Sequence, residues 1–216
     1  MKKKMGFLIG GSFIAAFVLW TLLVSLVDVE AIGPRGSEVG FASLNGAVHR
    51  LVGVNMTLYT FTDWLGLVPI GVAFCFGIMG LFQWIRRRHF TRVDFDILTL
   101  GGFYILVIAF YVTFEFLVIN RRPVLIEGYL EASYPSSTTV LVMCVMITAE
   151  TVLSRRIKNR TARLCVKAVI YAFVIFMVVG RLISGVHWLS DIVGGALFST
   201  GVVMLYCAVN KTDCKF

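Results

Sequence analysis

The sequence predicts an all-α membrane protein, a six-transmembrane-helix bundle with an amphipathic helix on the outer leaflet. Of its 216 residues, 58% are hydrophobic and only 15% are charged. An ordinary soluble domain is about 45–50% apolar and about 25% charged. The apolar residues gather in long runs, and the basic residues gather in short blocks between those runs. The length fits a single domain over residues 1–216.

Six apolar runs are long enough to cross a bilayer as helices, which takes roughly 20 residues. They are Met5–Val27, Leu65–Ile85, Ile97–Ile119, Ser137–Leu153, Cys165–Ile183 and Ile192–Val209. The first run is too long for a signal peptide, and the sequence VDVEA that follows it is a poor cleavage site. We therefore expect the first run to be a membrane span like the others.

The basic blocks predict the orientation of the chain. Fifteen of the 20 Lys and Arg residues lie on the side that holds both termini, and five lie on the other side. Because short loops rich in Lys and Arg stay in the cytoplasm, we expect a multi-pass plasma-membrane protein with both termini cytoplasmic. The net charge of +8 then needs no nucleic-acid partner, since such binding requires a basic face on a folded soluble surface.

The longest outer loop, Asp28–Trp64, contains one expected helix. Apolar residues recur in it at helical spacing, at Phe41, Leu44, Val48, Leu51 and Val52. Two interpretations are open at this stage. The helix either lies on the outer leaflet of the bilayer or packs against the bundle.

Three outer arginines stand at the ends of spans. Arg121 and Arg122 follow the third span in the sequence NRRP, and Arg181 closes the fifth span. Ionisable groups at span ends that face a bundle are candidates for function. Arginines on the outer side are also unusual under the positive-inside rule. We therefore expect an anion to neutralise their charge.

Two further segments carry candidate residues at the same depth. His187 and Asp191 are four residues apart, a spacing that places two side chains on one face of a helix. An Asp there can hold one imidazole nitrogen and leave the other free as a nucleophile or base. The sequence YPSSTT at 134–139 predicts a helix start, and the free N–H groups of Ser136 and Ser137 would make it an anion site.

Together these segments resemble the type 2 phosphatidic acid phosphatase superfamily of membrane lipid phosphatases. Its motifs are Lys, six residues, Arg-Pro; then Pro-Ser-Gly-His; then Ser-Arg, five residues, His, three residues, Asp. In this chain they correspond, in order, to Arg122-Pro123, to Pro135–Thr138, and to Arg181, His187 and Asp191. The order of the motifs, the six spans and the outward site also match, so the resemblance covers most of the chain.

The resemblance implies a role for each matching position. His187 corresponds to the nucleophile that forms a phosphohistidine, and Asp191 to the carboxylate that orients it. Arg122 and Arg181 correspond to the phosphate clamps, for which a planar guanidinium suits bidentate contact. Ser136 corresponds to a residue that binds phosphate through its backbone N–H and hydroxyl. The family needs no metal, so we expect neither a metal nor another cofactor.

The chain departs from the family pattern at three positions. Glu115 stands where the family has Lys, which reverses the charge, and Thr138 replaces the His that would protonate the leaving group. Gly180 replaces the Ser of the third motif. Arg121 is a candidate for the missing cation, and Glu115 is a candidate partner for Arg121 or Arg122.

The missing acid predicts the class of substrate. A lipid monophosphate must expel an alkoxide, about as basic as hydroxide, whose parent water has a pKa of about 15.7. A lipid diphosphate expels a phosphate monoester, whose second pKa is about 6. With Thr138 in place of the acid, an enzyme would lose less of its rate on a diphosphate than on a monophosphate. This favours an undecaprenyl-diphosphate type of substrate. Two alternatives stay open: a silent relative that binds or moves a phospholipid head group, and a lipid phosphotransferase that uses His187.

Overall fold

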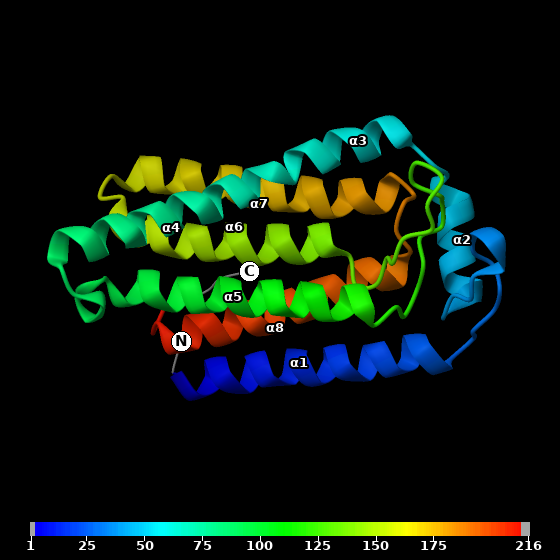
Figure 1. The fold of residues 1–216 in the computed structure, drawn as a ribbon, viewed down its shortest axis with the longest axis horizontal. Coiled ribbons are helices and arrows are strands. Elements are labelled where there is room, and N and C mark those ends of the chain that lie inside the picture. Colours follow the sequence, from blue (N-terminus) through cyan, green and yellow to red (C-terminus); the bar gives the residue numbers. More distant parts are fainter. Residues whose placement is uncertain (1–2, 213–216) are drawn as a thin grey trace.

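A computed structural model describes residues 3–212 of the chain. Its helices, in order, are α1 (Lys3–Leu26), η1 (Pro34–Gly36), α2 (Ala42–Val52), α3 (Met56–Leu65), α4 (Leu67–Arg87), η2 (Phe90–Arg92), α5 (Phe95–Phe116), α6 (Ser137–Arg156), α7 (Arg160–Ile183) and α8 (Leu189–Val209). The regular structure of the described residues is helical, and the long helices run side by side as a bundle (Figure 1). The predicted all-α fold class is confirmed.

Six helical segments are long and apolar enough to span a membrane, as predicted. They are Lys4–Leu26, Met56–Arg87, Phe95–Phe116, Ser137–Arg156, Arg160–Ile183 and Leu189–Val209. The second differs from its prediction because α3 runs almost directly into α4, with only Gly66 between them. The sequence predicts the α3 residues in the outer loop Asp28–Trp64, because the apolar run of the second span begins at Leu65.

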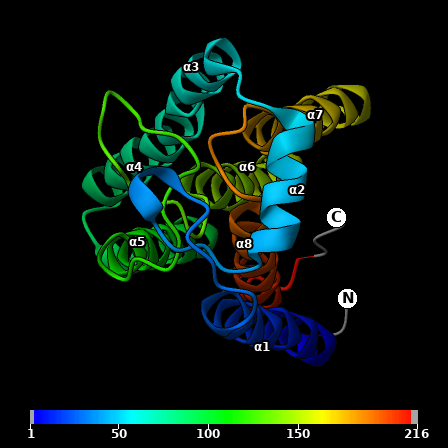
Figure 2. The ribbon, with the colours of Figure 1, turned by 90° about the vertical axis from the view of Figure 1, so that its right-hand side faces the viewer.

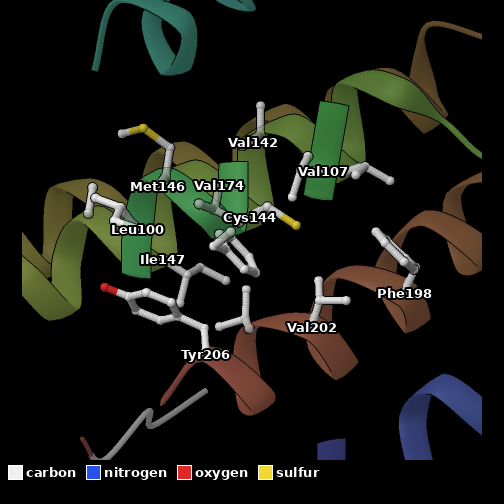
Figure 3. Packing of buried hydrophobic residues seen from close by; sticks show 14 of the residues in the cluster. Leu100, Val107, Val142, Cys144, Met146, Ile147, Val174, Phe198, Val202 and Tyr206 are labelled. Carbon is white, nitrogen blue, oxygen red and sulfur yellow. The ribbon is translucent and has the colours of Figure 1, made fainter. Parts of the chain in front are cut away.

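Helix α6 occupies the centre of the bundle, with α4, α5, α7 and α8 around it, and α1 packs on the outside of α8 (Figure 2). Within its most apolar stretch 72% of the residues are buried, and the value for α8 is 67%. The other four spans bury only 17% each, so most of their surface is free to face lipid. Side chains of α5, α6, α7 and α8 meet in the core, among them Leu100, Ile147 and Phe198 (Figure 3).

Helix α2 crosses one end of the bundle (Figure 2). Its buried residues are Ala42 and Asn45, and the Asn45 side-chain amide donates to the Gly40 carbonyl at 2.7 Å and to Ser190 Oγ at 2.9 Å. Leu44 and Leu51 of the apolar stripe are 46% and 86% exposed. The two interpretations of this helix are therefore compatible, because one face packs on the bundle while Leu44 and Leu51 remain available to the leaflet.

The two ends of the bundle differ in what they carry. Helix α1 begins and α8 ends at one end, together with the α4–α5 and α6–α7 connections (Figure 1). We call this the basic end, because it holds the cationic blocks at 86–92 and 155–163. The opposite end carries α2 and the segment 117–136, and we call it the site end.

Two glycines bring the segment before α6 onto α8. A Cβ added at Gly194 would lie 2.7 Å from the hydroxyl oxygen of Tyr134, and one at Gly195 would lie 3.2 Å from the carbonyl oxygen of Ser136. Side chains at these positions would push the two segments apart. The absence of a Cβ therefore places the start of α6 directly against the first turns of α8.

Candidate active site

His187 lies in the tight link between α7 and α8, two residues before the first residue of α8. The link turns at Gly185, whose φ is +68°, and a Cβ there would run into the carbonyl oxygen of Gly53. The helical premise for pairing His187 with Asp191 is therefore wrong. The two side chains meet because Asp191 lies in the first turn of α8, where its Oδ2 accepts a hydrogen bond from the Trp188 N–H at 3.0 Å.

The Asp191 carboxylate is fully buried and held from several sides. Its Oδ2 lies 3.6 Å from His187 Nδ1. Its Oδ1 accepts a hydrogen bond from the Asn120 amide at 3.2 Å, and Ser190 Oγ lies 3.5 Å away. The Asn120 side-chain oxygen in turn accepts from the Gly40 N–H at 3.1 Å. This network fixes the carboxylate behind the imidazole, where it can orient the ring.

The other imidazole nitrogen faces an arginine. His187 Nε2 lies 3.4 Å from Arg122 Nη1, and because a guanidinium only donates, Nε2 is the acceptor. Burial lowers the pKa of His187 well below its usual value of about 6.5, and the charges of Arg122 and Arg181 act in the same direction. These effects favour the neutral form of the imidazole, with its Nε2 lone pair facing Arg122.

The two arginines share the ring of Tyr59, a residue of α3. The guanidinium carbon of Arg181 lies 4.8 Å from the ring centroid, and that of Arg122 lies 6.0 Å from it. Arg181 is 1% exposed, and its Nη1 lies 3.5 Å from both Thr62 Oγ1 and Asp63 Oδ1. Two buried cations close to one neutral histidine can bind a phosphoryl group and stabilise charge that develops on it.

At the start of α6, Ser137 and Thr138 line the cavity, whereas Ser136, the expected residue, is hydrogen-bonded within the protein. The Ser136 N–H donates to the Asp191 carbonyl at 3.0 Å, and Ser136 Oγ accepts hydrogen bonds from the N–H and hydroxyl of Thr139. The backbone N–H of Ser136 is thus already used within the protein. Ser137 and Thr138 are the first two helical residues, and both line the cavity described next. They present the helix N-terminus to it.

A cavity of about 550 Å³ leads away from His187 between α4, α5 and α6. Most of its wall is apolar, and its polar end carries His187, Ser133, Ser137 and Thr138. Ile70 and Ile108 line it and are 51% and 62% exposed. The cavity therefore opens onto the lipid-facing surface of the bundle, a shape suited to an apolar chain with a polar head.

Two candidates lie apart from the His187–Arg122 pair. The Arg121 side chain donates to the Leu130 carbonyl at 3.0 Å. Glu115 is exposed at the wall of the cavity. Among residues 3–212 no ion pair joins it to either neighbouring arginine, and Arg122 Nε lies instead 2.9 Å from Glu131 Oε2.

Within the same residues, no three His, Cys, Asp or Glu side chains gather in a group that could hold a metal ion.

Four residues that contact the site are not among those predicted from the sequence. Asn120 directly precedes the two arginines, but a lone amide carries no motif. Tyr59, Thr62 and Asp63 lie three and four residues apart on α3, so they share one helical face. A polar face within an otherwise apolar run was the signal that could have identified them.

Comparison with known proteins identifies the family of this chain. The model of the PAP2 superfamily matches residues 99–213, more than half of the sequence. The chain belongs to the PAP2 superfamily. The proposed resemblance is thereby confirmed, and the family supports a lipid phosphatase type of function.

A solved structure of the same superfamily is similar in fold. It is the first transmembrane PAP2-type phosphatidylglycerolphosphate phosphatase from Bacillus subtilis, with 16% sequence identity and a TM-score of 0.54. The match covers 94% of each chain, so the likeness extends over the whole bundle. The comparison with curated proteins finds no match.

Proposed function

We propose that this PAP2 protein is a metal-independent lipid diphosphatase that works through a phosphohistidine at His187. One observation carries the proposal. The buried imidazole of His187 lies between the Asp191 carboxylate and the Arg122 guanidinium, at 3.6 and 3.4 Å, at the polar end of an apolar cavity. A nucleophile, its orienting group and a phosphate clamp are thus adjacent to a place for a lipid chain.

In the first step His187 Nε2 attacks the terminal phosphorus of the lipid diphosphate. An N–P bond forms, the bridging P–O bond breaks, and lipid monophosphate leaves with the electron pair. Arg122 and Arg181 would neutralise the oxygens of the transferring group, and Asp191 would stabilise the positive charge that the ring gains. The N–H groups of Ser137 and Thr138 supply further donors to those oxygens.

Thr138 supports a diphosphate rather than a monophosphate substrate. It lines the cavity with His187, but its hydroxyl does not protonate an alkoxide at neutral pH. General-acid assistance is worth about 10²–10⁴-fold where the leaving group needs it. A phosphate monoester leaves without that help, so the substitution costs a diphosphatase little.

The test is phosphate release from matched lipid mono- and diphosphates with purified protein in vesicles. The diphosphate should react faster, and His187→Ala should abolish turnover. Thr138→His, alone and with Glu115→Lys, should help the monophosphate more than the diphosphate. Equal or greater rates on the monophosphate would contradict the leaving-group argument. Head-group binding without release would favour a silent relative, and phosphate transferred to an added alcohol would favour a phosphotransferase.

We further propose that the site end faces outward, with both termini cytoplasmic. The proposal rests on the sequence count of Lys and Arg, fifteen on the side assigned to the termini and five on the other. A cysteine introduced at Glu38 should react with a membrane-impermeant thiol reagent added from outside, and one at Lys158 should be protected. The reverse pattern would invert the topology.

A further inference from the structure

Helix α3 gives the site a carboxylate that the family motifs do not include. Asp63 Oδ1 lies 3.5 Å from Arg181 Nη1, one helical turn from Tyr59, whose ring carries the same guanidinium. The Asp63 side chain is 57% exposed, whereas that of Arg181 is 2% exposed. Asp63 therefore touches a buried phosphate-clamping arginine while remaining open to water.

Asp63 also lines the cavity that contains His187 and Thr138. Two other carboxylates near the site each share one of these properties. Glu131 pairs with Arg122 but is not among the residues that line the cavity, and Glu115 lines the cavity. Among residues 3–212, Asp63 alone combines an ion pair to a clamping arginine with a place on the cavity wall.

The second half of the proposed reaction needs such a group. After the first step the phosphoryl group is bonded to His187 Nε2, and water must attack it. A water molecule attacks far better when a base removes its proton, and a threonine hydroxyl at position 138 does not act as that base at neutral pH. A carboxylate is a common general base and can take that proton.

We infer that Asp63 is the general base for hydrolysis of the phosphohistidine, an inference that rests on the proposed function. Its carboxylate takes one proton from water while the water oxygen bonds to phosphorus. The P–N bond breaks, and its electron pair returns to Nε2 of His187. Inorganic phosphate leaves, and Asp63 gives its proton to solvent. Arg181 holds both the carboxylate and the phosphoryl group, which aligns the water between them.

The experiment separates the two half-reactions by rapid mixing with lipid diphosphate labelled in its terminal phosphate. Asp63→Asn should release lipid monophosphate in a burst equal to the enzyme concentration, at the wild-type rate. Labelled phosphoprotein should then accumulate, and steady-state turnover should fall about 10²-fold or more. Hydroxylamine, a nucleophile that needs no base, should restore turnover. Asp63→Glu should recover part of it without hydroxylamine.

Matched variants make the outcome decisive. Glu131→Gln neutralises the carboxylate paired with Arg122, and it should not accumulate phosphoprotein whatever its effect on the first step. A burst that slows in parallel with turnover in Asp63→Asn would show that Asp63 only positions Arg181, and would overturn the inference. Wild-type turnover in Asp63→Asn would overturn it as well. If the wild-type protein turns over but no phosphoprotein forms in it or in any variant, the phosphohistidine route itself is overturned, and the inference with it.

Discussion

Arginines meet carboxylates at both ends of the bundle, but the two groups differ in how well they are satisfied. At the basic end, Arg87 Nη1 lies 2.7 Å from Asp94, and Arg156 Nη2 lies 2.9 Å from Asp96. The hydrogen bond from Arg87 lowers the pKa of Asp94. These side chains are partly exposed, and each charge has a close partner of opposite sign.

At the site end Arg122 Nε lies 2.9 Å from Glu131 Oε2, but Arg181 is buried and weakly partnered. The carboxylate contact of Arg181 is 3.5 Å long, and within the described residues its buried Nε has no hydrogen-bond partner. A buried charge is costly unless it is paired and hydrogen-bonded. The ion pairs cited at the basic end therefore satisfy their charges, whereas Arg181 at the site end retains hydrogen-bonding capacity for an anion. Four predictions test this contrast, beginning with the largest expected effect.

Arg181→Lys should lower turnover by about 10³-fold, because an ammonium cannot reproduce the planar fork that stabilises a transferring phosphoryl group. The protein should still fold, since the positive charge remains beside Tyr59 and Asp63. Inorganic phosphate should raise the melting temperature of the wild type and not that of the variant. Full turnover in the variant would mean that Arg181 is structural, like the arginines of the basic end.

Asn120→Ala should lower both stability and turnover. Removing the amide leaves buried Asp191 Oδ1 with one donor fewer, which costs about 1–3 kcal/mol. Denaturation in detergent measures the first effect, and phosphate release per folded molecule measures the second. Asn210→Ala, which removes a hydrogen bond to Thr99 at the basic end, is the matched control. It should lower stability while leaving turnover per folded molecule unchanged.

The His187 imidazole should remain neutral as the pH falls through 6.5. Burial and the two nearby cations lower its pKa, so the neutral form persists below the pH at which an exposed histidine becomes charged. NMR titration of the three imidazoles tests this, with the His187 resonance assigned by its loss in His187→Gln. Arg122→Gln removes one of the cations and should shift the titration to higher pH. A wild-type midpoint at or above 6.5 would contradict the electrostatic description.

Arg156→Gln should have the smallest effect. Its ion pairs with Asp94 and Asp96 are partly exposed, and exposed pairs contribute about 0–1 kcal/mol. Thermal denaturation should change little, and phosphate release should not change. A large loss of activity would mean that the ion pairs of the basic end affect the site. The two ends would then not differ in function as described.

The sequence predicted the spans because their length and apolar composition are set by the thickness of a bilayer. The third motif and NRRP pointed to residues that the structure brings together, and their catalytic roles remain predictions. The sequence does not predict the contributions of Tyr59 and Asp63, because it places the α3 residues in an outer loop. Ser136 shows another limit: only the fold determines that its backbone N–H bonds to the Asp191 carbonyl.

The lateral opening of the cavity between α4 and α5 affects how kinetics on this protein must be measured. A substrate that arrives through the bilayer is not dissolved in the buffer, so its effective concentration is a mole fraction in the membrane. Diluting the vesicles should leave the rate per protein unchanged, whereas adding inert lipid at constant substrate should lower it. Chain length adds a second variable, since each buried methylene contributes about 0.8 kcal/mol to retention in the membrane. Water-soluble analogues without that chain therefore underestimate the rate on a lipid.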